Sequence, residues 1–245
     1  MSDRCPTGIP GLDEILGGGF PRARSILLAG SCGTGKTTLA IQFLVSGIVN
    51  YNEPGVLVTL EQDSDEIRRD MLKYGWDLKK LEEEKKLILI DTSLSKIGIK
   101  EYVTSLPVAP EKSFSLLPGE FDFERITDLV VASARKINAK RVVVDSLPAL
   151  DVLSKNETSI RRVLLQMNYE FKVNGLNSIL ITEVPEEDGV SKHGVEEYVS
   201  DGVIIVKTNE ALDTRTIKIR KMRITKHTLK PIALEITQQG IQVKK

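Results

Sequence analysis

Short apolar runs and amphipathic stretches alternate along the first three quarters of the chain. The apolar runs have the length and composition of buried parallel strands, and they cover Ser25–Ala29, Gly55–Glu61, Leu87–Asp91, Arg141–Ser146 and Asn177–Glu183. The stretches between them repeat apolar residues at helical spacing, which predicts helices over Thr37–Val49, Ser64–Tyr74, Leu78–Lys86, 122–137 and Ser159–Asn174. Ser64 is the predicted N-cap of its helix. This order predicts an α/β fold with a mostly parallel central sheet flanked by helices.

The last quarter of the chain has strand patterns with no helices between them. Gly202–Val206, Thr216–Ile224 and Ile232–Ile236 are predicted as antiparallel strands on one edge of the sheet. Residues 92–124 contain scattered Ser, Pro and Gly with isolated aromatics, which is typical of an insertion loop. Because we find no internal repeat, we expect residues 1–245 to form a single domain.

Composition narrows the choice of partners and compartment. Lys and Arg number 34, and so do Asp and Glu, so the chain has no global charge that attracts nucleic acid or an acidic membrane. It has no long apolar run and no signal-peptide pattern, so we expect a cytoplasmic protein without membrane contact. Its two cysteines do not suggest a disulfide framework.

A glycine-rich motif follows the first predicted strand. Residues 30–38 read Gly-Ser-Cys-Gly-Thr-Gly-Lys-Thr-Thr, which fits G-x-x-x-x-G-K-[ST] between a strand and a helix. Glycines let successive N–H groups face one anion, and the start of the helix adds partial positive charge. Lys36 is expected to reach the β- and γ-phosphates and the Thr37 hydroxyl to bind Mg²⁺. The predicted phosphate-binding residues are Gly33, Thr34, Gly35, Lys36, Thr37 and Thr38. The motif predicts binding of a nucleoside triphosphate.

Acidic residues end several of the predicted strands. Asp145 is the expected second Mg²⁺ residue, because an acid at the end of an apolar strand accompanies phosphate loops of this kind. Parallel strands end at one edge of the sheet, so Glu61 can face the γ-phosphate as general base, with Gln62 positioning the water. The other interpretation of Glu61 is a solvated strand-end acid. Thr182 and Glu183 end at the same edge, either as a γ-phosphate sensor or as an ordinary surface pair.

A basic stretch lies near the C-terminal end of the sequence. It comprises Lys218, Arg220, Lys221, Arg223, Lys226 and Lys230. Alternation with Ile217, Ile219 and Met222 predicts a half-buried strand with one basic face. Three interpretations stay open: a solvated edge strand, an arginine finger given to a neighbour's nucleotide, or a groove for nucleic acid.

Several segments together resemble a known family. They are Thr7–Asp13 with Gly18-Gly19, Val58–Gln62, Val143–Leu147, His193–Asp201, and Lys221-Met222-Arg223 with Thr225 and His227. With the phosphate loop, they make nearly the whole chain similar to single-domain KaiC-like ATPases of the RecA/RadA superfamily. In that family the Lys-x-Arg pair reaches the γ-phosphate held by the next subunit.

The resemblance implies ATP as the nucleotide, with Mg²⁺, bound between the subunits of a homo-oligomeric ring that is a hexamer. It implies that Lys221 and Arg223 act in trans, and that Met222, Thr225 and His227 line the same nucleotide. Glu61-Gln62 stands where the family often has a Glu pair, so we expect a slow ATPase. Glu197-Tyr198 occupies the place of the Ser-Thr pair that the two-domain clock protein phosphorylates, which argues against autokinase activity.

Two functional hypotheses follow. The favoured one is an ATP-hydrolysing ring that acts in signalling or regulation through a protein partner. The alternative is a recombinase paralogue that binds single- or double-stranded DNA, and the neutral net charge counts against it. A third interpretation is a nucleotide sensor that does not hydrolyse ATP.

Overall fold

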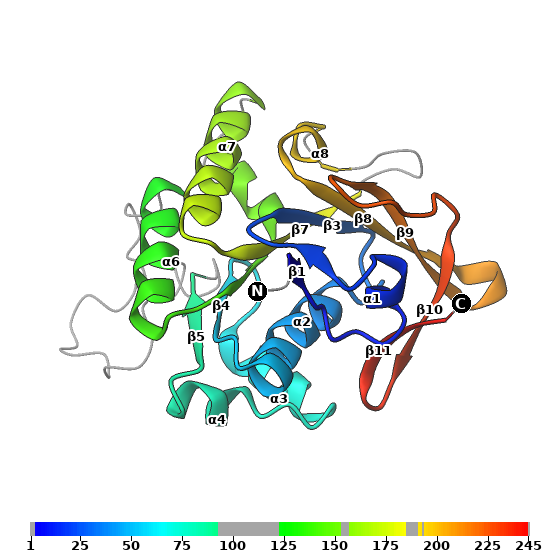
Figure 1. Ribbon diagram of the computed structural model, residues 1–245, viewed down its shortest axis with the longest axis horizontal. Coiled ribbons are helices and arrows are strands. Elements are labelled where there is room, and N and C mark those ends of the chain that lie inside the picture. Colours follow the sequence, from blue (N-terminus) through cyan, green and yellow to red (C-terminus); the bar gives the residue numbers. More distant parts are fainter. Residues whose placement is uncertain (1–2, 93–122, 153–156, 185–190, 193, 245) are drawn as a thin grey trace.

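The computed structural model describes residues 3–92, 123–152, 157–184, 191–192 and 194–244. Within these residues, one nine-stranded sheet has the order β11-β10-β9-β8-β3-β7-β6-β4-β5 (Figure 1). The strands are β3 (Ser25–Gly30), β4 (Gly55–Thr59), β5 (Leu87–Asp91), β6 (Arg141–Asp145), β7 (Asn177–Glu183), β8 (Gly202–Asn209), β9 (Thr214–Met222), β10 (Ile232–Thr237) and β11 (Gly240–Lys244). Neighbours from β8 to β5 are parallel, and the pairs from β8 to β11 are antiparallel. The predicted fold class is confirmed.

Helices cover both faces of the parallel part of the sheet (Figure 1). One face carries α2 (Lys36–Tyr51), α3 (Ser64–Leu72) and α4 (Leu78–Glu83), and the other carries α6 (Phe123–Ile137) and α7 (Glu157–Val173). Along β3, Ile26 and Leu28 belong to the core beside α2, whereas Leu27 and Ala29 belong to the core beside α6 and α7. Because both faces are buried, the strand is continuously apolar from Ile26 to Ala29 rather than alternating.

Shorter elements complete the described fold. They are β1 (Arg4–Cys5), α1 (Leu12–Ile15), β2 (Phe20–Pro21), α8 (Glu196–Val199) and the 3₁₀ turns Leu147–Val152 and Glu210–Leu212. Asp13 in α1 accepts hydrogen bonds from the Thr7 N–H at 2.7 Å, the Thr7 hydroxyl at 2.7 Å and the Gly8 N–H at 3.1 Å. These bonds fix the opening turn against the core. Among the described residues, no helix combines the length and apolar character that crossing a bilayer requires.

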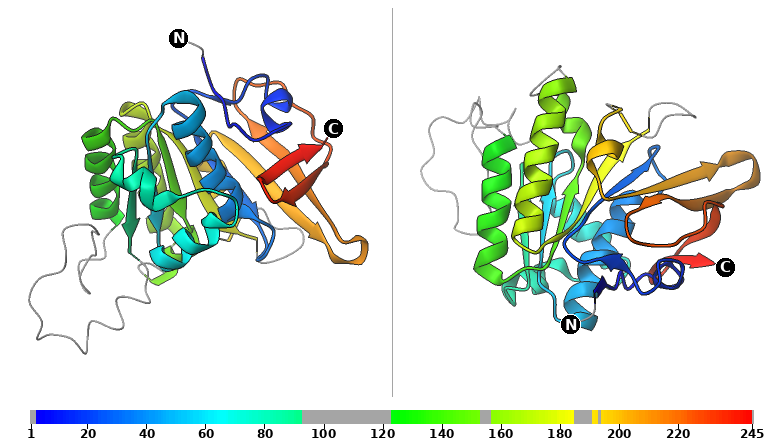
Figure 2. Two further views of the ribbon diagram at one scale, coloured as in Figure 1. Left: turned by 90° about the horizontal axis from the view of Figure 1, so that it is seen from below. Right: turned by 45° about the horizontal axis from the view of Figure 1, so that its top comes forward.

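The direction of β8 corrects one expectation. Gly202–Val206 was predicted to be antiparallel, but these residues pair in parallel with β3, from Ile26 opposite Gly202 to Gly30 opposite Val206. The connection from β7 to β8 spans residues 184–201 and includes α8, so the chain has the length that a parallel return requires. The antiparallel additions therefore begin only with β9 (Figure 2).

Two further details differ from the predictions. Asp63 rather than Ser64 caps α3, because the Asp63 carboxylate accepts from the Asp65 N–H at 2.7 Å. The final strand β11 was not predicted. The insertion loop predicted at 92–124 lies, apart from its ends, outside the described residues.

Candidate nucleotide-binding site

The phosphate loop connects β3 to α2 at the carboxyl edge of the sheet. Gly33 and Gly35 have φ of 76° and 96°, in the left-handed region that favours glycine. At Gly30 a Cβ atom would lie 2.5 Å from the carbonyl oxygen of Val206, so only glycine fits between β3 and β8. The buried Thr34 donates its hydroxyl to the Ser31 carbonyl at 2.9 Å. The loop is thus fixed at its start by the close approach of β8 and in its middle by the Thr34 hydrogen bond.

Lys36 lies over this loop. Its Nζ donates to the carbonyl oxygens of Gly30 at 2.9 Å and Ser31 at 2.8 Å. Burial lowers the pKa of this lysine, while the nearby carboxylates of Glu183 and Asp145 oppose that shift. A buried ammonium on the first residue of a helix is suited to bind a multiply charged phosphate, whose negative charge would compensate the desolvation of the ammonium.

The Thr37 hydroxyl donates to the Asp145 carboxylate at 2.7 Å. The sheet fixes the position of Asp145 for this contact. The strand β6 places Asp145 opposite Thr59 of β4, and the Leu60 N–H donates to the Asp145 carbonyl at 2.6 Å. Burial raises the pKa of the Asp145 carboxyl to about 6, the negative Glu61 adds to the rise, and the Thr37 hydrogen bond opposes it. A hydroxyl and a carboxylate are oxygen donors of the kind that Mg²⁺ takes together with phosphate oxygens and water.

Glu61 and Gln62 follow the end of β4. Glu61 is exposed, and its charge acts on both Asp145 and Lys36. The Gln62 carbonyl accepts from the Thr59 hydroxyl at 2.5 Å, which fixes the backbone after the strand. The fold therefore brings the predicted base to the same edge as the phosphate loop.

The Thr182–Glu183 pair divides between two surroundings. Glu183 lies opposite Gly30 in the β3–β7 register, and its negative charge acts on Lys36. Thr182 is fully buried and donates its hydroxyl to the Glu196 carboxylate of α8 at 3.2 Å. Only Glu183 is placed beside the phosphate loop as a γ-phosphate sensor requires.

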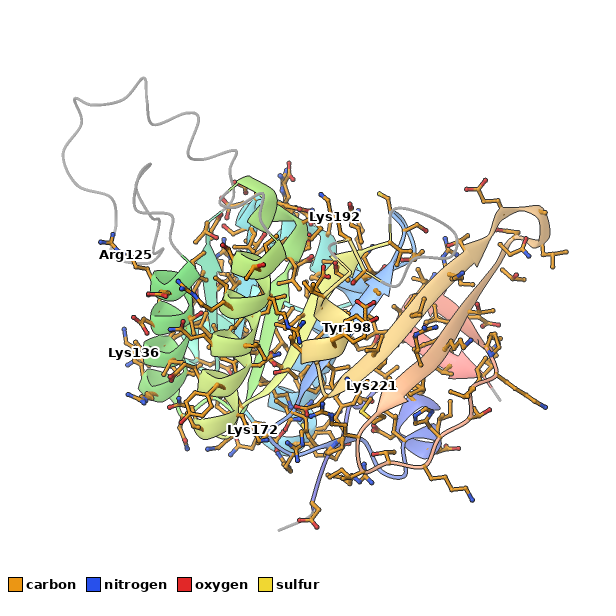
Figure 3. The ribbon with its side chains drawn as sticks, turned by 90° about the horizontal axis from the view of Figure 1, so that it is seen from above. Arg125, Lys136, Lys172, Lys192, Tyr198 and Lys221 are labelled. Atoms are coloured by element: carbon orange, nitrogen blue, oxygen red, sulfur yellow. The ribbon has the colours of Figure 1, made fainter. Side chains whose placement is uncertain are left out.

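Lys221 and Arg223 lie where β9 ends, against α8 and the residues that follow it (Figure 3). The Lys221 Nζ donates to the carbonyl oxygens of Glu197 at 3.0 Å and Ser200 at 2.6 Å. Burial, reinforced by the Arg223 charge, lowers the pKa of Lys221. The Arg223 side chain is 56% exposed, and it forms an ion pair with Asp201 at 3.2 Å.

Within one chain, the phosphate loop and the Lys221–Arg223 pair lie level with opposite ends of the strand β3. Met222 pairs with Gly202, which lies opposite Ile26 near the start of β3, whereas the phosphate loop follows Gly30 at its end. Four strand residues correspond to about 13 Å, before the lateral offset between β3 and β9 is added. A single chain therefore keeps these two groups apart.

The other predicted nucleotide contacts, Met222, Thr225 and His227, differ in how far their side chains are buried. The Met222 side chain is 5% exposed and packs against Gly202 in the core, so only its backbone is available to a ligand. Thr225 is half-buried, and its hydroxyl donates to the Arg223 carbonyl at 3.3 Å. His227 is half-buried as well, with Nδ1 3.2 Å from the Thr228 carbonyl oxygen. His193 of the resemblance lies outside the described residues.

Three residues of this region were not singled out from the sequence. Glu196, the first residue of α8, is fully buried and accepts from Thr182, and Asp201 forms an ion pair with Arg223 and also lies 3.8 Å from Arg24. Glu196 and Asp201 belong to the segment His193–Asp201, which contributed to the family resemblance but to whose acidic residues no role was assigned. Arg4 contacts the turn after Arg223, and no local pattern in the sequence marks it.

Comparison with known proteins agrees with this geometry. A sequence profile described as "ATPase: KaiC" matches residues 5–245. The circadian clock oscillator proteins KaiC of Acaryochloris marina and Synechococcus elongatus are 35% and 34% identical over 240 residues, which is 97% of this chain and 43% of each relative. The chain thus spans less than half the length of these relatives. The crystal structure of a KaiC-like protein from Pyrococcus horikoshii has a TM-score of 0.82 and 36% identity, and each chain is covered to 99%.

Proposed function

Because the chain belongs to the KaiC ATPase family, we propose that it hydrolyses ATP to ADP and phosphate as a ring whose sites lie between subunits. The observation that carries the proposal is the 2.7 Å contact between Thr37 and Asp145 beside the Lys36 ammonium. It joins the phosphate loop to the acid of a separate strand, as hydrolysis with a divalent cation requires.

In the proposed reaction, the γ-phosphate lies at the phosphate loop, where Lys36 and the backbone N–H groups stabilise its negative charge. Glu61 accepts a proton from a water as the water oxygen attacks the γ-phosphorus. The bond between the γ-phosphorus and the oxygen that bridges to the β-phosphate breaks, and ADP leaves. Bound Mg²⁺, held by Thr37 and Asp145, would neutralise charge on the β- and γ-phosphates. Gln62 stands next to Glu61 to orient the water.

The opposite placement of Lys221 and Arg223 supports a site completed by a second subunit. These cations cannot serve the phosphate loop of their own chain, yet Arg223 is more than half exposed at the far edge. Stacking subunits head to tail brings that edge to the next phosphate loop, and such contacts close into a ring. We propose a homohexamer in which Thr225 and His227 line the same nucleotide and Met222 contributes only its backbone.

We place the ring in cytoplasmic signalling or regulation through a protein partner. The relatives named circadian clock oscillator proteins are more than twice as long, and only part of them corresponds to this chain. Residues 1–245 are proposed to act as one ATPase domain, since one sheet links the described elements from β3 to β11. Turnover is proposed to be slow, because Glu61 is followed by Gln62 rather than a second acid.

Replacing Glu61 by Gln tests the hydrolytic role. We expect Glu61→Gln to lower the rate of phosphate release by about 10²- to 10⁴-fold while ATP still binds, because the general base is lost and the phosphate loop is intact. Glu66→Gln, on the exposed side of α3, is the matched control and should keep the wild-type rate. Unchanged phosphate release by Glu61→Gln would refute this role.

The same assay separates a regulatory ATPase from a DNA-dependent one. Phosphate release is measured with and without single-stranded DNA at fixed salt and protein concentration. The proposal expects equal rates, whereas stimulation of several-fold that weakens at higher salt would favour the recombinase-paralogue function.

A further inference from the structure

The turn that follows Arg223 has an unfavourable backbone conformation. Ile224 has a φ of 52°, in the left-handed region that a β-branched residue rarely adopts, and its side chain is 75% exposed. The Thr225 N–H closes the turn by donating to the Met222 carbonyl at 3.3 Å. An exposed side chain cannot hold such a turn by packing, so other contacts must stabilise it.

Arg4 supplies these contacts from the opposite end of the sequence. Its Nη1 donates to the Thr225 hydroxyl at 2.5 Å, and its Nη2 donates to the Ile224 carbonyl at 3.2 Å. The guanidinium therefore binds two consecutive residues of the turn with its planar fork. The backbone of Arg4 is itself fixed, because β1 pairs with β2 and places Arg4 opposite Pro21.

The Arg4 contacts also reach Arg223 through Thr225. The hydroxyl that accepts from Arg4 donates in turn to the Arg223 carbonyl at 3.3 Å, and the Arg223 N–H donates to the Asp201 carbonyl at 3.0 Å. The backbone of Arg223 is thus bound on one side to β1 through Thr225 and on the other to Asp201, two residues after the end of α8. Without Arg4, the turn between these points loses two of its hydrogen bonds.

We infer that Arg4 is a positioning residue, which holds the turn 223–225 so that Arg223 and Thr225 reach the nucleotide bound by the next subunit. This inference rests on the proposed function, because it assumes that these residues act in trans. Arg4 touches neither substrate nor phosphate in this role. Its effect passes through the turn, and a displacement of about 1 Å at such a group costs about 10²-fold in rate in other enzymes.

The test compares phosphate release by Arg4→Ala, Arg4→Lys and the control Arg135→Ala in the chain of residues 1–245. Arg135 is an exposed arginine whose Nε donates to Asn174 at 3.0 Å, far from the turn in sequence and structure. We expect kcat to fall by about tenfold or more in Arg4→Ala, with a smaller change in the KM for ATP, because the displaced groups act mainly in the transition state. Arg4→Lys should be intermediate, since it keeps the charge without the fork.

Mixing subunits distinguishes positioning from a loss of stability. An Arg4→Ala subunit keeps its own phosphate loop and Glu61, whereas a Glu61→Gln subunit keeps an intact turn. In a random equal mixture about half of the Arg4→Ala sites face an intact turn, so the rate per Arg4→Ala subunit should rise towards half that of wild type. A rate within about twofold of wild type in Arg4→Ala, or a loss that mixing does not correct, would overturn the inference.

Arg223→Ala separates the two possible failures. If Arg223→Ala also keeps the wild-type rate, the trans site itself is wrong. If Arg223→Ala is inactive while Arg4→Ala is fully active, the proposed function stands and only the role of Arg4 is wrong.

Discussion

At the scale of single residues, the buried position of Asp145 at the carboxyl edge of the sheet lowers the free energy of unfolding at neutral pH. Burial desolvates the Asp145 carboxylate more than the nearby Lys36 ammonium compensates, and it raises the pKa of this carboxyl from 3.8 to about 6. The native state therefore binds more protons than the unfolded chain between these two pH values. Its favourable contribution is complete below about pH 3.8 and is lost as the pH rises through about 6. At neutral pH the buried carboxylate destabilises the nucleotide-free fold.

Asp145→Asn tests this cost. The amide removes the buried charge and can still accept from Thr37, so we expect the nucleotide-free variant to be more stable at pH 7.5 by about 1–3 kcal/mol. The gain should shrink steadily as the pH falls towards 4, because the wild-type carboxyl is then protonated. Urea unfolding at several pH values measures this difference. A gain that is the same at pH 4 and pH 7.5 would assign the effect to packing rather than charge.

Site residues can be predicted from the sequence where a local pattern marks each of them. Thr37 and Asp145 meet as expected, because the phosphate loop and the strand-end acid both follow from local pattern. The direction of a side chain is harder to predict, since it depends on partners distant in the sequence. Thr182 faces Glu196, and Met222 packs into the core, for this reason.

At the scale of elements, the β10–β11 hairpin packs against the phosphate loop and the helix α2. Gln42 of α2 donates to the Ile241 carbonyl at 2.9 Å and accepts from the Ile241 N–H at 2.6 Å, so its amide pairs with β11 as a neighbouring strand would. A Cβ at Gly35 would lie 3.0 Å from Ile236 and 3.4 Å from Ile241. The hairpin is thus bound to both the helix and the loop that precedes it.

Gln42→Leu tests this support. The substitution leaves two buried backbone groups of Ile241 without these partners, and we expect a loss of about 2–3 kcal/mol in the free energy of unfolding together with weaker ATP binding. Urea unfolding and ATP titration measure the two effects. Gln239→Leu, on the exposed turn of the same hairpin, is the control. Wild-type ATP affinity in a destabilised Gln42→Leu protein would show that the hairpin does not support the loop.

Strand positions could be predicted well where the apolar run is continuous, as for Leu87–Asp91 and Asn177–Glu183, whose predicted bounds are those of β5 and β7. Strand direction could not, because β8 has the same apolar pattern whether it pairs in parallel or antiparallel. The strand β11 was missed because it is short and polar at alternate positions, and its place depends on Gln42.

At the scale of the whole molecule, the sheet separates the phosphate loop from the Lys221–Arg223 pair. The phosphate loop follows the end of β3, and Lys221 and Arg223 lie level with its beginning, beyond β8. The resemblance to KaiC-like ATPases predicts a ring, and the opposite placement of these two groups supports the proposed site between subunits. The contact between Arg4 and Thr225 could not be predicted, because 221 positions separate the two residues and no local pattern in the sequence marks Arg4.

Mixed rings of two inactive variants test the shared site most directly. Arg223→Ala retains Glu61, and Glu61→Gln retains Arg223, so each alone should release phosphate very slowly, since an arginine of this kind contributes about 10³-fold or more. In a random equal mixture about a quarter of the sites combine both intact groups, and we expect about a quarter of the wild-type rate. A mixture no faster than the average of its two components would contradict a site formed between subunits.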